Sequence, residues 1–310
     1  MFSQVRDSLQ RTEGGIVATP RFGGSWTERK LNALREYLVQ YQLIFTRNPS
    51  AKKLKTVYVD AFAGTGERDA GEDPRQELLF GYGQDTRGYQ EGSVRVALSL
   101  ENKFHHYVFI DKQERHTSAL QDLIRTTFPT LAERCSVEYE DANRWLQNWC
   151  RTQDWRGQRA VVFLDPYGMN VQWVTIEAIA ATRAIDLWVL FPFAIGANRM
   201  MPKDAPPDSA WAKKLTAIFG TDEWKSRFYR EDRKMDLFGG TSGSIVKIAG
   251  MDDILALFLE RLGKIFAGIV KRPLILENSK HTPMYALCFG AGNPRGAPTA
   301  VRIASYLTRG

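Results

Sequence analysis

Cysteine and histidine are scarce in this chain of 310 residues, which has three of the first and four of the second. The cysteines, Cys135, Cys150 and Cys288, lie far apart and show no C-x-x-C spacing. A structural zinc site and a disulfide framework are therefore both disfavoured, and we expect free thiols in or near a core. The few histidines show no ligand spacing, so the sequence predicts no metal site.

Long apolar runs are also missing. No stretch reaches the length of a membrane span, so we expect no contact with a membrane. The first residues, MFSQVRDSLQRTEGG, lack the apolar segment of a signal peptide, and the prediction is a cytoplasmic protein. Hydrophobic residues nevertheless make up 44% of the chain, which suffices for a sizeable core. The formal net charge of +7 is compatible with a polyanionic partner such as nucleic acid.

Apolar, strand-like segments alternate with helical patterns over the first two thirds of the chain. The expected strands cover 56–62, 106–111, 135–142, 160–166 and 185–193. The expected helices cover 26–46, a segment that begins near 92, 114–128, a segment through Trp145 and Trp149, and 173–182. This alternation predicts an α/β fold with a mostly parallel sheet covered on both faces.

Three segments depart from the regular alternation of strands and helices. Residues 1–24 are polar and glycine-spotted, and we interpret them as a flexible N-terminal arm. Residues 194–270 carry helical patterns without intervening strands, and we interpret them as an α-helical insertion. The remaining residues form the core, which closes with an antiparallel pair of strands: 25–193 and 271–310, with the strands at 273–278 and 284–290.

Four acidic residues follow successive expected strands, and this is the main indication of a site. They are Asp60, Asp111, Asp141 and Asp165. Ligands of open α/β sheets bind outside the carboxyl ends of the strands, where the strand order reverses. Each aspartate alone fits a helix cap or a turn. Because all four fall in the same place relative to a strand, a binding site is the better explanation.

The first aspartate opens the stretch D-A-F-A-G-T-G, in which glycines allow a close approach of the backbone to a ligand. The stretch is neither G-x-G-x-x-G nor a phosphate-binding loop with Gly-Lys-[Ser/Thr], so an NAD-type oxidoreductase is disfavoured. It suits a ligand with a cationic amino-acid end. The polar segment 67–90 that follows is interpreted as a loop covering the site. The residues assigned to this end of the ligand are Asp60, Phe62, Ala63, Gly64, Thr65 and Gly66.

The next two aspartates complete the expected ligand. Asp111, with Lys112 beside it, offers a carboxylate to ribose hydroxyls. Asp141, followed by Ala142, can accept a hydrogen bond from an adenine amino group. An adenosine with a charged amino-acid tail is S-adenosylmethionine, which is the predicted cofactor.

The fourth aspartate belongs to Asp165-Pro166-Tyr167, which resembles the D-P-P-Y element of methyltransferases that modify exocyclic amines of bases. The carboxylate of Asp165 and the carbonyl of Pro166 would accept the N–H groups of the amine, and Tyr167 would stack on the base. A base within a duplex must first be flipped out. The second proline of the element is missing here, and a plain strand-to-helix turn is the alternative.

Several stretches together resemble the three-Cys-motif partner protein family: WTERKLNALREYLVQY, YVDAFAGTG, FLDPYGM, DLWVLFPF, FGTDEWKSRFY and YALCFGAGNPRG. The resemblance covers about residues 25–300. It implies a Rossmann-like class I methyltransferase fold, with a mostly parallel seven-stranded sheet, an antiparallel closing strand and a helical insertion. It also implies a protein partner that carries the three-cysteine motif.

Two functions remain open on this basis. The first is an S-adenosylmethionine-dependent methyltransferase that acts on an exocyclic amine of a nucleic-acid base, with backbone contacts from the basic stretch 203–234. The second is a non-catalytic adenine-nucleotide-binding module that keeps the methyltransferase fold and docks a protein partner.

Overall fold

A computed structural model describes residues 25–64, 92–235 and 241–309. The predicted N-terminal arm and the predicted covering loop lie outside these residues, as do Thr65 and Gly66. Within the described part, no helix combines the length and the apolar character needed to cross a membrane. The three cysteines are free thiols; Cys150 and Cys288 are buried and Cys135 is half-buried, as predicted.

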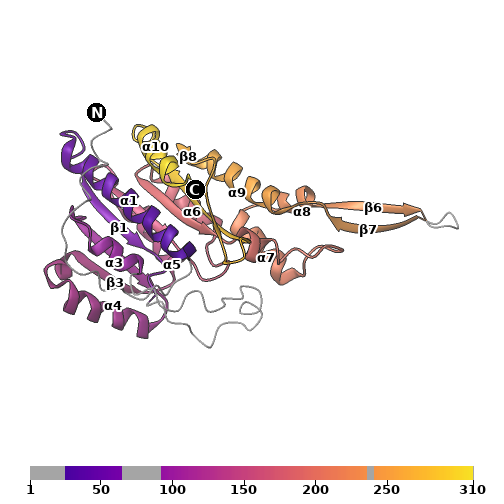
Figure 1. The fold of residues 1–310 in the computed structure, drawn as a ribbon, viewed down its shortest axis with the longest axis horizontal. Coiled ribbons are helices and arrows are strands. Elements are labelled where there is room, and N and C mark those ends of the chain that lie inside the picture. The colour runs from indigo at the N-terminus through magenta and orange to yellow at the C-terminus, as the bar shows by residue number, and fades with distance from the viewer. Residues whose placement is uncertain (1–24, 65–91, 236–240, 310) are drawn as a thin grey trace.

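The core is one mixed sheet whose first five strands are parallel (Figure 1). The strand order is β3-β2-β1-β4-β5-β10-β8, and β9 also pairs with β10. Its strands are β1 (Lys55–Asp60), β2 (His106–Asp111), β3 (Cys135–Tyr139), β4 (Gln158–Leu164), β5 (Ile185–Phe191), β8 (Gly268–Ile269), β9 (Leu274–Glu277) and β10 (Pro283–Ala291). Strand β10 is antiparallel to β5, so this is the Rossmann-like methyltransferase fold that the resemblance implies.

Among the described residues the sheet has eight strands, one more than the seven predicted, and the difference lies at one edge. Both β8 and β9 pair with β10 on the side away from β5, so they are two pieces of one interrupted edge strand. The residues between them include Pro273, which has no N–H to donate to a ladder. The predicted antiparallel pair near the C-terminus is confirmed as β9 and β10.

Helices cover the sheet in two groups, because the chain reverses direction at the middle of the sheet. It runs outward from β1 to β3 and then crosses back to β4 and β5, so right-handed crossovers place the intervening helices on opposite faces. In one group α1 contacts α3 and α10, and in the other α6 contacts α5 and α9. The bounds are α1 (Ser25–Arg47), α3 (Ser93–Leu98), α4 (Glu114–Thr127), α10 (Ala297–Leu307), α5 (Ala142–Thr152), α6 (Trp173–Ala181) and α9 (Met251–Ile265).

Helix α1 shows how the predicted apolar stripe is used. Leu34, Leu38 and Tyr41 are buried, as the spacing of three and four residues predicts. Tyr37 lies on the same side and packs edge-on against Trp188 of β5. The stripe therefore fixes the long first helix on the sheet, next to strands that end at the candidate site.

The segment predicted as an α-helical insertion, 194–270, is helical only in part. It contains α7 (Ser209–Phe219), α8 (Glu223–Phe228) and α9, but also a hairpin of β6 (Tyr229–Met235) and β7 (Thr241–Lys247). Figure 1 shows this hairpin extending away from the rest of the molecule. Its first strand, YREDRKM, is mostly charged and has no period-2 apolar pattern to identify it. At its base, Lys247 Nζ donates to Asn198 Oδ1 at 2.6 Å.

Candidate functional site

The four predicted aspartates lie at one edge of the sheet. Asp60 is the last residue of β1 and Asp111 the last residue of β2. Asp165 follows β4 directly, and Asp141 precedes α5 after the end of β3. Since these strands are parallel neighbours, their carboxyl ends meet at the same edge. The strand order reverses at β1 and β4, which is where such folds bind ligands.

Asp165 forms an ion pair with a residue that sequence reasoning missed. The ammonium of Lys30, on α1, donates to Asp165 Oδ2. Lys30 is buried although it is charged, and its Nζ stands 5.3 Å from the centroid of the Trp26 ring. A lysine between the apolar positions of an amphipathic helix was the signal available in the sequence, because such a residue faces the core.

Asp60 is a buried carboxylate with an unusual environment. It is 0% exposed, and neither of its oxygens has a hydrogen-bond partner among the residues described. Burial raises its pKa to about 7, and the nearby Asp165 adds to the rise. The Ser93 hydroxyl, the Phe62 amide and the Lys30 ammonium offset part of it, the first two at geometries looser than a hydrogen bond. A buried polar group without a partner in a strand-end site indicates a place for a ligand.

The glycine loop after β1 brings Gly64 against Asp111. A Cβ atom at Gly64 would lie 3.5 Å from Asp111 Oδ2. The loop is held on both sides, since the Ala61 amide donates to the Phe163 carbonyl and the Ala63 amide to the Ile110 carbonyl. The residues predicted to bind the two parts of the ligand, after β1 and at the end of β2, are therefore neighbours in the fold.

Asp111 is oriented by two donors, neither of which the sequence analysis identified. The Gln113 amide donates to Oδ1 at 2.8 Å, and His116 Nδ1 lies 3.1 Å from Oδ2. His116 is in the first turn of α4, and its Nε2 is buried without a partner in the described segments. Across those same segments no three potential metal ligands cluster.

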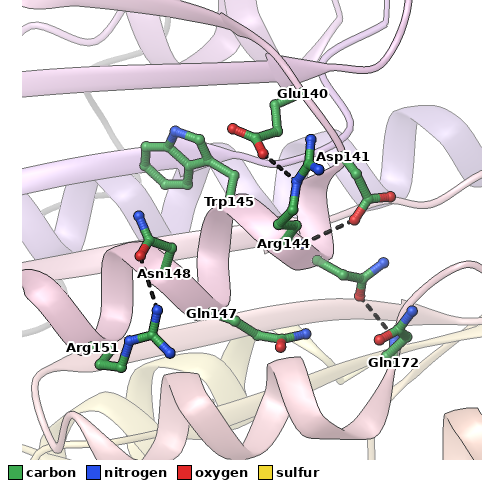
Figure 2. Close-up of a pocket in the computed structure, with 9 residues that line it drawn as sticks. Glu140, Asp141, Arg144, Trp145, Gln147, Asn148, Arg151 and Gln172 are labelled. Carbon is green, nitrogen blue, oxygen red and sulfur yellow. Dashed lines mark hydrogen bonds and ion pairs between the residues drawn. The ribbon is translucent and has the colours of Figure 1, made fainter.

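Asp141 is a helix cap and also lies at a hollow in the surface. It caps α5, because its Oδ1 accepts from the Arg144 amide at 2.9 Å. It also lines a hollow of about 540 Å³ on the outer side of that helix, together with Trp145 and Gln172 (Figure 2). The Arg144 guanidinium turns to Glu140 and forms an exposed ion pair. Oδ1 of Asp141 thus belongs to the helix cap, and the second carboxylate oxygen points away from the Arg144 amide (Figure 2).

The loop that carries Asp165, Pro166 and Tyr167 is tied to α5 by one buried side chain. Asn143 Nδ2 donates to the Asn170 carbonyl at 2.8 Å, and Asn143 Oδ1 accepts from the Gln172 amide and the Thr175 hydroxyl, each at 2.9 Å. Within the loop Pro166 is buried, and Tyr167 is 37% exposed. Tyr167 is thus partly accessible beside Asp165.

Replacing Asn143 by Ala should lower the free energy of unfolding by about 3 kcal/mol, since three hydrogen bonds are lost at roughly 1 kcal/mol each. Asn148→Ala is the matched control on the same helix, because Asn148 is exposed and its side chain accepts from the exposed Arg151 guanidinium at 3.1 Å. Urea unfolding of both variants measures the difference. Equal losses in the two variants would show that Asn143 does not hold the loop.

Comparisons with known proteins leave the family open. No family model matches the chain, and no curated protein matches it. The resemblance to the three-Cys-motif partner family therefore stays a prediction. Among solved structures, a Legionella pneumophila protein described by the family model DUF519 aligns over 87% of this chain and 98% of its own, with 15% identity and a TM-score of 0.40.

Two further structures are similar at the same low level. A proposed methyltransferase from Escherichia coli aligns over 76% of this chain and 92% of its own, with 12% identity and a TM-score of 0.32. The glycopeptide N-methyltransferase MtfA, in complex with S-adenosylhomocysteine, aligns over 87% and 91%, with 9% identity and a TM-score of 0.30. Identities this low concern the fold alone, so the function has to be argued from the site.

Proposed function

We propose that the protein is an S-adenosylmethionine-dependent methyltransferase that acts on an exocyclic amine of a nucleic-acid base. The observation that carries the proposal is the buried Asp60, whose two oxygens have no partner among the described residues, beside the Lys30–Asp165 pair at the switch point of the sheet. An ammonium group would satisfy these oxygens. The residues present therefore fit a cofactor whose tail is an amino acid.

Each part of the cofactor has a proposed place. Asp60 and the loop through Phe62, Ala63 and Gly64 would hold the amino-acid end, with Thr65 and Gly66 continuing that loop. Asp111, held in place by Gln113 and His116, would accept hydrogen bonds from the ribose, with Lys112 beside it. Asp141 and the Ala142 amide would bind the adenine edge at the N-terminus of α5.

Asp165, Pro166 and Tyr167 would bind the acceptor. S-adenosylmethionine supplies a methyl group on a positively charged sulfur. Lys30 occupies Asp165 Oδ2, which leaves Oδ1 to accept an N–H of the acceptor amine. The Pro166 carbonyl would accept the second N–H, and these two bonds would orient the nitrogen lone pair toward the methyl group. Tyr167 would stack on the base, a contact worth about 1–3 kcal/mol.

Contacts with the nucleic-acid backbone are proposed for the basic stretch 203–234. Part of its charge is already used within the protein. Lys225 pairs with Asp222 at 3.1 Å, and Arg227 pairs with Glu260 at 2.6 Å. A modest number of phosphate contacts is therefore expected from this stretch, and binding should weaken as salt is added.

The second candidate is a non-catalytic module that binds an adenine nucleotide and docks a protein partner with a three-cysteine motif. The missing second proline in the Asp165-Pro166-Tyr167 element favours it, as does the projecting β6–β7 hairpin. A two-stranded hairpin is marginally stable alone in water, and a docked partner would stabilise it. The two candidates share the adenosine site and differ at Asp165.

Calorimetric titration with S-adenosylmethionine, S-adenosylhomocysteine and NAD tests the cofactor. We expect both sulfur ligands to bind and NAD not to bind. Asp111→Ala should weaken S-adenosylhomocysteine roughly 10- to 100-fold, because a carboxylate that accepts from the ribose is lost. Asp204→Ala, at an exposed aspartate, is the control and should bind normally. Failure of both sulfur ligands to bind would contradict the proposal.

Transfer of tritiated methyl groups to DNA, tRNA and rRNA tests the acceptor. We expect Asp165→Ala to reduce transfer by at least about 100-fold while most of the cofactor affinity remains. If labelled nucleic acid still forms at the normal rate, the catalytic assignment of Asp165 is wrong. Cofactor binding without transfer to any nucleic acid would favour the docking module.

A further inference from the structure

Lys30 is a buried cation for which the folded protein provides only part of the hydrogen bonding that it needs. Lysine is seldom fully buried unless it is paired. This ammonium has three N–H donors, one of which goes to Asp165 Oδ2. Among the residues described, its other recorded contact is the face of Trp26, which is itself stacked on Tyr285 at 5.3 Å. The Trp26 ring therefore lies beside the ammonium without taking up all of its N–H groups, and donor capacity remains at the head of Lys30.

The charges around Lys30 restrict what its remaining donors can bind. Asp165 lies on one side of the ammonium, and Asp60 is close enough for each of these charges to influence it. One ammonium and two carboxylates therefore share this part of the site. A phosphate would add up to two further negative charges beside the carboxylates, and their repulsion would oppose binding. A zwitterion suits these charges, because its cation can face Asp60 while its anion faces Lys30.

We propose that Lys30 binds the α-carboxylate of the amino-acid tail of the cofactor, opposite the ammonium at Asp60. The inference rests on the proposed function and adds a residue that lies outside the sequence motifs of the site. Lys30 would then contact Asp165 and the tail together, through different N–H groups. The same lysine would hold the acceptor-binding carboxylate and the cofactor in a fixed relative position.

Two ligands that differ only in the carboxylate give a test on the unaltered protein. We expect S-adenosylmethionine to bind roughly 10- to 100-fold more tightly than its decarboxylated form in calorimetric titrations, because a charge-assisted hydrogen bond is lost. The decarboxylated ligand carries one more net positive charge, and the two aspartates would favour it if Lys30 played no part. Equal or tighter binding of the decarboxylated ligand would overturn the proposal.

A substitution then assigns the preference to Lys30. In Lys30→Met the gap between the two ligands should close or reverse, while Arg29→Met, at an exposed neighbour on α1, should keep it. Lys30→Arg should restore most of the preference, because it keeps the positive charge. If Lys30→Met does not fold, Lys30→Met/Asp165→Asn removes both members of the ion pair and is compared in the same way. A preference that survives the loss of Lys30 would contradict the assignment.

The outcomes separate this inference from the proposal on which it rests. If the unaltered protein binds neither S-adenosylmethionine nor S-adenosylhomocysteine, the proposed function fails and the inference fails with it. If both bind but Lys30→Met weakens the carboxylated and decarboxylated ligands equally, only the role of Lys30 is wrong. Tighter binding of adenosine 5′-phosphate than of S-adenosylmethionine would contradict the expected preference of this site for a zwitterion.

Discussion

Asp60→Asn should stabilise the protein at pH 8 by on the order of 4 kcal/mol and should abolish cofactor binding. The folded protein holds the Asp60 carboxyl with a pKa of about 7, against an ordinary value of 3.8, chiefly because burial disfavours the charged form. Each pH unit between the folded and unfolded pKa is worth about 1.4 kcal/mol. An asparagine of the same shape has no charge to bury.

The expected pH dependence follows from the direction of this change. Below the unfolded pKa both states carry the proton, and the folded state has no penalty from Asp60. As the pH rises from about 4 to about 7, the unfolded chain releases its proton first, so the free energy of unfolding falls. Above pH 7 the loss is complete. The neighbouring charges Asp165 and Lys30 and the buried Tyr58 hydroxyl lie close to this carboxyl and set its final value.

Urea unfolding of the wild type and Asp60→Asn at pH 5, 6, 7 and 8 measures the effect. A smaller fall between about pH 4 and 6 should remain in the variant, since burial also raises the pKa of Asp186 to about 6. Asp204→Asn, at an exposed position, is the control and should match the wild type. Equal stability of wild type and Asp60→Asn at pH 8 would show that Asp60 has an ordinary pKa in the folded protein.

A gain in stability together with a loss of binding is what a functional carboxylate should give. The buried Asp60 carboxylate destabilises the folded protein when it is charged. Such a destabilising charge is useful only if a cation of the ligand binds to it. A purely structural aspartate would behave differently, because its partners would be lost and the protein destabilised. The Asp60 variant therefore distinguishes a ligand site from a structural turn.

The parallel part of the sheet and the alignment of the four aspartates could be predicted from the sequence. Strands β1, β2, β4 and β5 are largely apolar runs separated by helical patterns, and such patterns depend on neighbours in the chain. The predicted strand at 106–111 coincides with β2. Once parallel order is accepted, aspartates that follow successive strands must lie at one edge. The apolar and helical patterns, together with the rule that parallel strands end at a common edge, were sufficient to predict this part of the fold.

The partners of these aspartates could not be predicted in the same way. Lys30 reaches Asp165 across 135 positions of sequence, and Asn143 reaches the Asn170 carbonyl across 27. No local pattern encodes such contacts, because they depend on how helices pack on the sheet. His116 is only five residues from Asp111, but a histidine in the first turn of a helix has no distinctive spacing. The hairpin was missed because its first strand is mostly charged and has no alternating apolar pattern.

Gly220→Ala should lower the free energy of unfolding by about 4 kcal/mol. Gly220 follows α7 with φ of 64°, a left-handed conformation in which a side chain costs about 1 kcal/mol or more. A Cβ atom there would lie 2.0 Å from Trp173 Cδ1, and overpacking of a dense core costs a further 1–3 kcal/mol. Gly157→Ala, with no heavy atom within 4 Å of the new Cβ, should change stability by less than about 0.5 kcal/mol.

The Trp173 side chain is packed on all sides and cannot move away from a new Cβ atom at residue 220. Its position connects the insertion to the candidate site. It is fully buried, its Nε1 donates to Glu177 at 2.7 Å, and the Arg261 guanidinium covers its ring at 4.7 Å. Because Trp173 begins α6, directly after the loop that carries Asp165, its displacement should also loosen that loop. Urea unfolding of both glycine variants measures the stability, and methyl transfer measures the loop. A Gly220→Ala protein as stable as Gly157→Ala would show that α7 does not press on Trp173.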